Sequence, residues 1–154
     1  MQTGDVWVVG GAVAAAVAAL ALISMRAAPD AEVLDLGQAL YGTHCASCHG
    51  ADLKGQPDWQ RTLASGRLPA PTHDASGHTW HHPDGVLVRI IRDGPAAVVG
   101  GGYESDMPGF GDALSEKEIE AIIEFLKSTW PERERRYQAE MTRREREGPQ
   151  QAEE

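Results

Sequence analysis

Cysteine is nearly absent from this sequence of 154 residues: there are two, Cys45 and Cys48. Two cysteines cannot build a disulfide scaffold, and a structural zinc site needs four Cys or His ligands at a recognisable spacing. Aromatic residues are also scarce, at 6% of the chain. A domain of roughly 100 residues can bury only a modest core with this composition, and a large flat cofactor would help to fill it.

Positive charge is in short supply. The chain has 14 Lys and Arg against 23 Asp and Glu, and a formal net charge of −9. This balance argues against nucleic acid as a partner, because neutralising phosphates needs a basic surface. Most of the excess lies in residues 32–131, which hold seven basic and fourteen acidic residues. We therefore expect partner proteins to dock through a basic surface.

One long apolar run, residues 6–23, carries no charge. At about 1.5 Å per residue it is just long enough for a hydrocarbon layer ~30 Å thick. The alternative is the core of a cleaved signal peptide, which usually spans about 7–15 residues. The length of the run and the lack of a small-x-small site after it favour an anchor. Arg26 follows the run and no basic residue precedes it, so the positive-inside rule alone would place the residues after the run in the cytoplasm. Residues 1–26 are interpreted as a membrane anchor or signal segment, and residues 27–32 as a linker.

Helical patterns divide the rest of the chain into a domain at 33–131 and a charged tail at 132–154. Helices are predicted over residues 33–43 and 84–93, with a long loop over 94–111. The clearest helix follows Ser115, where Ser115 and Glu118 form a capping-box pattern before an apolar repeat. The tail has acid-before-base pairs at i, i+4 but no apolar stripe, which predicts an exposed, solvated helix.

The strongest motif is Cys-Ala-Ser-Cys-His at residues 45–49. Cys45 and Cys48 can each add to a haem vinyl group, and the adjacent His49 is then placed to bind the iron, so this spacing indicates c-type haem attachment. A thioredoxin-like redox pair is the rival interpretation. That pair belongs beside a βαβ pattern, and the sequence contains none.

Three stretches resemble class I cytochromes c of bacteria: residues 36–41, the attachment motif with Gly50, and residues 107–126. The resemblance covers about residues 33–131. It implies an all-α fold of a few short helices around one covalent haem c, flanked here by the N-terminal apolar helix and the C-terminal helical tail. It also implies that Gly37 on the first helix meets Phe125 on the last.

The same resemblance implies the iron ligands. His49 is the proximal ligand, and Met107, followed by Pro108, is the sixth. Two alternatives stay open: Met107 is an ordinary core residue, or His81 or His82 is the sixth ligand. The proximal imidazole is expected to donate its other N–H to a proline carbonyl, at Pro71 rather than Pro69.

Two further side chains are candidates for contacts with the haem. The N–H of Trp80 and the O–H of Tyr103 are candidates for holding the haem propionates, with an ordinary core role equally open. The histidines at 73, 78, 81 and 82 invite a second metal site, but a structural role in a turn-rich loop is the preferred interpretation.

An iron with both axial positions filled by protein favours electron transfer over catalysis. We expect an electron carrier, not an enzyme, at the outer, periplasmic face of a bacterial inner membrane, or soluble in the periplasm if the apolar segment is cleaved. A haem subunit or metal-handling accessory of a larger membrane complex is the alternative. A ligand-binding sensor or peroxidase-like enzyme would require Met107 to be displaced.

Overall fold

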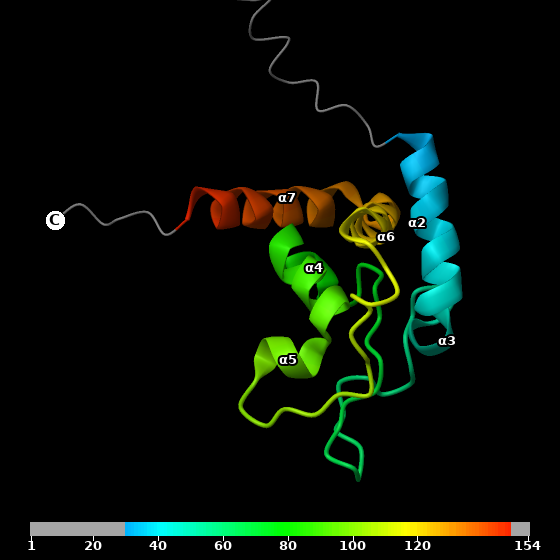
Figure 1. Cartoon of the computed structure of the whole chain (residues 1–154), viewed down its shortest axis with the longest axis vertical. Helices are drawn as coiled ribbons and strands as arrows, with labels where there is room; N and C mark the ends of the chain where they lie inside the picture. Colours follow the sequence, from blue (N-terminus) through cyan, green and yellow to red (C-terminus); the bar gives the residue numbers. More distant parts are fainter. Residues whose placement is uncertain (1–29, 149–154) are drawn as a thin grey trace, which may run out of the picture.

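A computed structural model describes residues 30–148, and in this range all regular structure is helical, as expected for an all-α protein (Figure 1). The elements are α2 (Ala31–His44), α3 (Ala46–His49), the 3-10 helix η1 (Thr79–His81), α4 (Asp84–Asp93), α5 (Pro95–Val99), α6 (Glu116–Thr129) and α7 (Glu132–Glu147). The apolar run at residues 6–23 lies outside the described residues. Within residues 30–148, no helix combines the length and the hydrophobicity needed to cross a membrane.

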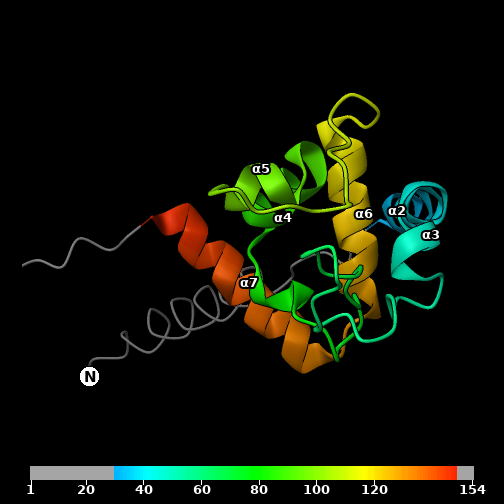
Figure 2. The same ribbon diagram turned by 90° about the horizontal axis from the view of Figure 1, so that it is seen from below.

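Helices α2 and α6 cross steeply and pack closely against one another, with α2 at the edge of the molecule (Figures 1 and 2). Asp30 begins α2, its side chain accepting a hydrogen bond from the amide of Glu32. The predicted capping box begins α6, with both of its hydrogen bonds between Ser115 and Glu118 present. The apolar repeat of α6 turns inward, and Ile119 is completely buried. The core comprises Tyr41, Leu53, Leu87, Ile91, Leu114, Ile119, Ile122, Ile123, Leu126 and Trp130.

Helix α4 spans the residues that the sequence predicts, with Pro83 and Gly94 at its two ends. The prediction of an unbroken loop over residues 94–111 is wrong, because α5 occupies Pro95–Val99. Pro95 is preorganised for a first helical turn, and its missing N–H costs nothing there. Three consecutive glycines, 100–102, all with positive φ, then end the short helix.

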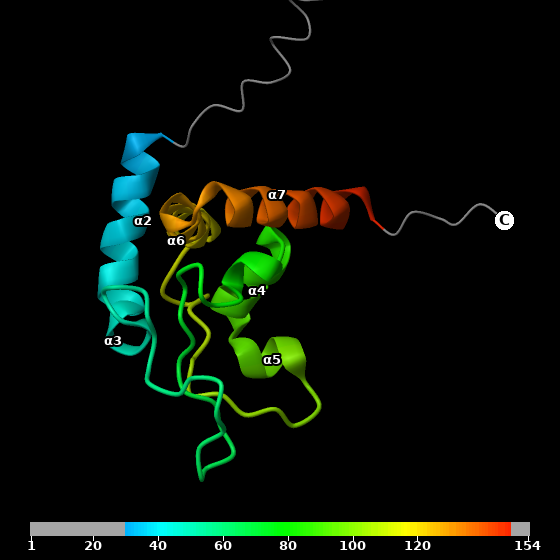
Figure 3. The same cartoon turned by 180° about the vertical axis from the view of Figure 1, so that it is seen from behind.

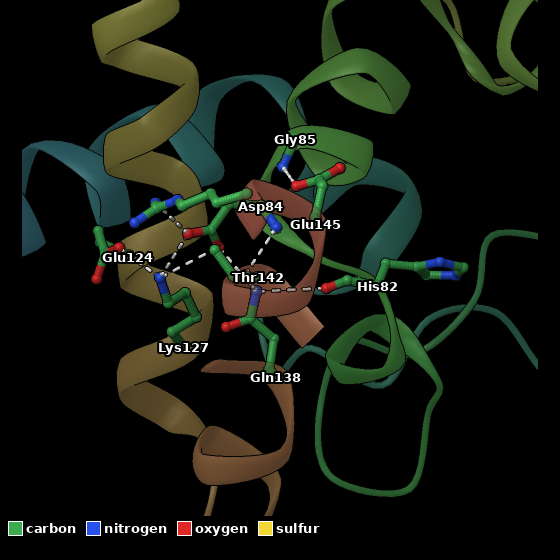
Figure 4. A network of polar contacts seen from close by, with 9 residues as sticks. His82, Asp84, Gly85, Glu124, Lys127, Gln138, Thr142 and Glu145 are labelled. Carbon is green, nitrogen blue, oxygen red and sulfur yellow. Dashed lines mark hydrogen bonds and ion pairs between the residues drawn. The ribbon is translucent and has the colours of Figure 1, made fainter. Parts of the chain in front are cut away.

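The tail forms the predicted helix, α7, which lies beside α4 (Figure 3). The expectation of a solvated helix is wrong, because α7 packs against both η1 and α4. Its inward face is polar: Glu134, Gln138 and Thr142 are all buried. The hydroxyl of Thr142 accepts from the amide of Asp84, and the Glu145 carboxylate accepts from that of Gly85 (Figure 4). The N-cap residue of α4, Pro83, has no side-chain group that could accept hydrogen bonds from the first amides of the helix, and α7 supplies these acceptors instead.

Candidate haem site

The attachment motif sits where one helix ends and a short one begins. Cys45 is the C-cap of α2 and the N-cap of α3, and the amide of His49 donates to the Cys45 carbonyl at 2.9 Å. One helical turn therefore carries both thiols and the imidazole. Cys45 is half-buried, Cys48 is exposed, and neither is in a disulfide. The hydroxyl of Tyr41 donates to the carbonyl of Gly50 at 2.8 Å and so ties α2 to the residue after the motif.

The two thiols do not have the properties of a catalytic dithiol. Burial, and then the neighbouring Cys48, raise the pKa of Cys45 to about 11. A disulfide oxidoreductase needs the opposite, a thiol with a lowered pKa that is ionised near neutrality. The raised pKa of the Cys45 thiol therefore disfavours a thioredoxin-like pair.

His49 is buried, at 6% exposure, and one of its ring nitrogens forms a hydrogen bond. Nδ1 lies 2.9 Å from the carbonyl oxygen of Pro71, which is the contact that the sequence predicts for Pro71 rather than Pro69. Because a carbonyl can only accept, Nδ1 carries the proton and Nε2 keeps its lone pair. Burial lowers the pKa of His49, partly offset by the Pro71 carbonyl, which keeps the ring neutral and able to bind a metal.

A tight loop after the motif brings Pro71 to the imidazole, and the sequence analysis did not identify its residues. The amide of Gly55 donates to the carbonyl of His49 at 2.8 Å. A Cβ on Gly55 would lie 2.6 Å from the carbonyl carbon of Pro71, and its φ is +67°. Leu53, with φ of 66°, accepts at its carbonyl from the amide of His73 at 2.7 Å. The Gly-rich composition of residues 50–55 is the only sequence signal for this loop.

The segment after Pro71 carries a second imidazole to the first. The ring of His73 stacks on that of His49, with centroids 4.1 Å apart and planes 28° from parallel. Nδ1 of His73 is hydrogen-bonded to the hydroxyl of Thr79 at 2.8 Å, and its carbonyl accepts from the indole of Trp130 at 2.7 Å. Burial, and then the neighbouring His49 and His78, lower the pKa of His73 to about 3. The sequence groups His73 with three other histidines, but the imidazole on which its ring stacks is that of His49.

Met107 is partly buried and packs against the core. Its amide donates to the hydroxyl of Ser105 at 3.1 Å. Two glycines that follow bring this loop onto the end of α4: Gly111 donates to the carbonyl of Arg92 at 2.9 Å, and a Cβ on Gly109 would lie 2.7 Å from the same oxygen. The loop is therefore fixed to a helix just after its methionine.

An arginine joins the loop before Pro71 to the loop that carries Met107. Arg67, in the loop before Pro71, forms ion pairs with Glu104, at 3.5 Å, and with Asp106, both in the loop that carries Met107. All three side chains are more than one third exposed. This cross-link connects the segment that orients His49 with the segment that carries the predicted sixth ligand.

The other residues singled out from the sequence have different surroundings. The indole of Trp80 donates to the carbonyl of Ala75 at 3.3 Å, and its ring packs against His81 and Tyr137, so its N–H is already engaged. Tyr103 is 38% exposed in the loop after α5. No group of three or more His, Cys, Asp or Glu side chains in residues 30–148 is arranged to hold a metal ion.

The residues present suit an iron porphyrin. Two unpaired thiols match the two vinyl groups, the free Nε2 of His49 matches an axial position, and Met107 supplies a thioether of the kind that haem iron accepts. An all-helical domain with this donor set defines the class of covalent haem proteins. Over residues 34–130, well over half of its length, the chain matches the family model described as cytochrome c, and it therefore belongs to the cytochrome c family and carries covalently bound haem c. Neither a curated protein nor a solved structure matches the chain. Helix α7 begins just after the matched range.

Proposed function

We propose that this haem protein is a one-electron carrier whose iron is bound by His49 and Met107, with the haem attached at Cys45 and Cys48. The observation that carries the proposal is the orientation of His49, whose Nδ1 is committed to the Pro71 carbonyl while Nε2 stays free. When bound, the haem supplies a single iron that alternates between ferric and ferrous states. The family supports haem-based electron transfer in general, and the specific ligand pair is our inference.

Protein ligands on both faces of the iron leave no position for a substrate, which favours a carrier over an enzyme. The hydrogen bond from His49 to Pro71 increases the basicity of the imidazole and fixes its tautomer. A thioether on the other face favours the ferrous state and raises the reduction potential relative to a second imidazole. The fixed loop around Gly109 holds Met107 in both oxidation states, so little rearrangement accompanies electron transfer.

Spectroscopy and carbon monoxide binding test this proposal on the full-length holoprotein. We expect a low-spin iron that does not bind carbon monoxide in the ferrous state. Met107→Leu removes the thioether at similar volume and should open the iron to carbon monoxide, whereas Met107→His should stay low-spin at a lower potential. Met141→Leu, in α7, is the matched control and should behave like the wild type. Carbon monoxide binding by the wild type would contradict the proposal.

Partner and location follow from charge and from the apolar run. We propose that redox partners dock through a basic surface, because residues 32–131 carry twice as many acidic as basic side chains. Electron transfer should then slow as ionic strength rises.

We also propose that residues 6–23 anchor the protein with its haem domain in the periplasm. Replacing residues 1–28 with a cleavable signal should release a soluble, haem-loaded protein, and a native N-terminus near Ala28 would mean cleavage instead.

A haem subunit of a larger membrane complex is the second candidate. It is favoured by the outer surface of α7, which lies beyond the matched range and exposes Arg133, Arg136 and Tyr137. Mild solubilisation of native membranes followed by size separation distinguishes the two. A carrier should migrate alone, and a subunit should migrate with its complex.

A further inference from the structure

His73 is held in place far more firmly than an ordinary loop residue. Its amide donates to the carbonyl of Leu53 and its own carbonyl accepts from the indole of Trp130, both at 2.7 Å. Its ring is hydrogen-bonded through Nδ1 to the buried hydroxyl of Thr79. With backbone and ring both fixed, the side chain has no freedom to turn away from its neighbour.

That neighbour is the imidazole of His49, on which the His73 ring stacks with centroids 4.1 Å apart and planes 28° from parallel. The hydrogen bond from His49 to Pro71 fixes one ring nitrogen but is a single contact, about which the ring can still tilt. A flat surface packed on one face of the ring removes this freedom. Pro71 and His73 belong to one short segment, so the same stretch of chain restrains the ring in two directions.

We propose that His73 is a positioning residue for the proximal ligand, and that its anchored ring fixes the rotational orientation of the His49 imidazole above the haem. This inference rests on the proposed coordination of iron by His49. The plane of an axial imidazole determines which iron d orbital it overlaps, and hence how unpaired spin in the ferric state is distributed over the haem methyl groups. The orientation therefore has a spectroscopic signature that is separate from folding.

The experiment compares haem methyl proton shifts of ferric full-length holoproteins by NMR. His73→Ala removes the packed ring and should change the order or the spread of the four methyl shifts. Thr79→Val removes the ring anchor at nearly constant volume and should shift the pattern in the same direction by a smaller amount. His73→Phe restores a flat ring and should return the pattern toward that of the wild type.

His78→Ala is the matched control, because His78 belongs to the same segment but stacks on Trp59, with centroids 5.5 Å apart. It should leave the methyl pattern unchanged. A wild-type pattern in both His73→Ala and Thr79→Val would overturn the positioning role, and so would an equal change in His78→Ala, which would indicate general loosening. If His73→Ala yields no folded protein, Thr79→Val alone decides. A wild-type protein without low-spin iron would instead overturn the proposed ligation, and the positioning role with it.

Discussion

Gly37 in α2 lies directly against the backbone of Ala121 in α6. A Cβ at Gly37 would overlap the carbonyl oxygen of Ala121, and it would come within 2.9 Å of the Cβ of Phe125. The approach that the sequence predicts between Gly37 and Phe125 is therefore present, and the tightest contact is with a backbone atom that cannot swing aside. The crossing of α2 and α6 depends on the missing side chain.

Gly37→Ala should therefore force the two helices apart and lower the free energy of unfolding by roughly 1–3 kcal/mol, as expected for overpacking. Gly42 in the same helix is the matched control, because nothing lies within 4 Å of its missing Cβ. Gly42→Ala should instead stabilise the protein by up to about 1 kcal/mol through helix propensity. Chemical denaturation of both variants measures the difference, and equal midpoints would contradict the close crossing.

Gly55→Ala should disturb the haem as well as the fold. Any residue other than glycine is strained by about 1–2 kcal/mol at such a positive φ, and here the added methyl group also collides with Pro71. Displacing Pro71 lengthens its hydrogen bond to His49, which makes the imidazole less basic and should raise the reduction potential.

A control substitution at Gly66 separates the backbone strain from the collision with Pro71. Its φ is +86°, but no atom lies within 4 Å of its missing Cβ. Gly66→Ala should cost a similar backbone strain while leaving the potential of the wild type. A redox titration of both variants checks this, and an unchanged potential in Gly55→Ala would show that the loop does not hold Pro71.

Arg67→Gln should loosen the loop that carries Met107. The ion pairs of Arg67 are solvent-exposed, so their loss should lower the free energy of unfolding by less than about 1 kcal/mol. An added anion such as cyanide can reach ferric iron only when Met107 dissociates. Freed from Glu104 and Asp106, the loop should open more often, and cyanide should bind several-fold faster.

The control for Arg67 is Arg61→Gln, an exposed arginine of the same loop for which the structure gives no ion pair with residues 30–148. It should bind cyanide at the wild-type rate in stopped-flow experiments. Equal rates in both variants and the wild type would mean that the ion pairs do not restrain Met107.

The sequence predicted those features of the fold and the site that depend on residues close together in the chain. The capping box before α6, the bounds of α4 and the haem motif could all be predicted from neighbouring residues. The stack of His73 on His49 could not, because it depends on a loop turned by Leu53 and Gly55 in left-handed conformations. Nothing in a histidine-rich stretch indicates which ring will meet the iron ligand.

The docking of α7 was missed for another reason. Amphipathic helices are recognised by an apolar stripe, whereas the buried positions of α7 are Glu134, Gln138 and Thr142, four residues apart and all polar. Their spacing is helical, but their chemistry resembles that of a solvated surface. Gln138 and Thr142 form hydrogen bonds with polar groups at the start of α4, a contact that the sequence alone does not reveal.

Gln138→Leu tests whether this polar contact holds α7 in place. Gln138 is fully buried, and the two N–H groups of its amide are shared among three acceptors: the carboxylate of Asp84 at 2.7 Å, the carbonyl of His82 at 3.3 Å and the hydroxyl of Thr142 at 3.0 Å. Leucine has a similar volume but removes this donor from all three acceptors, of which the Asp84 carboxylate keeps its ion pair with Lys127.

The variant should lower the free energy of unfolding by about 1–3 kcal/mol, the usual cost of leaving buried polar groups unpaired. The amides of Asp84 and Gly85, which α7 caps, should exchange their hydrogens faster as the helix detaches. Glu132→Gln is the control, because it breaks only an exposed ion pair with Arg136 and should change stability by less than about 0.5 kcal/mol. Unchanged exchange at Asp84 and Gly85 in Gln138→Leu would mean that apolar contacts, such as that of Tyr137 with Trp80, are sufficient to dock α7.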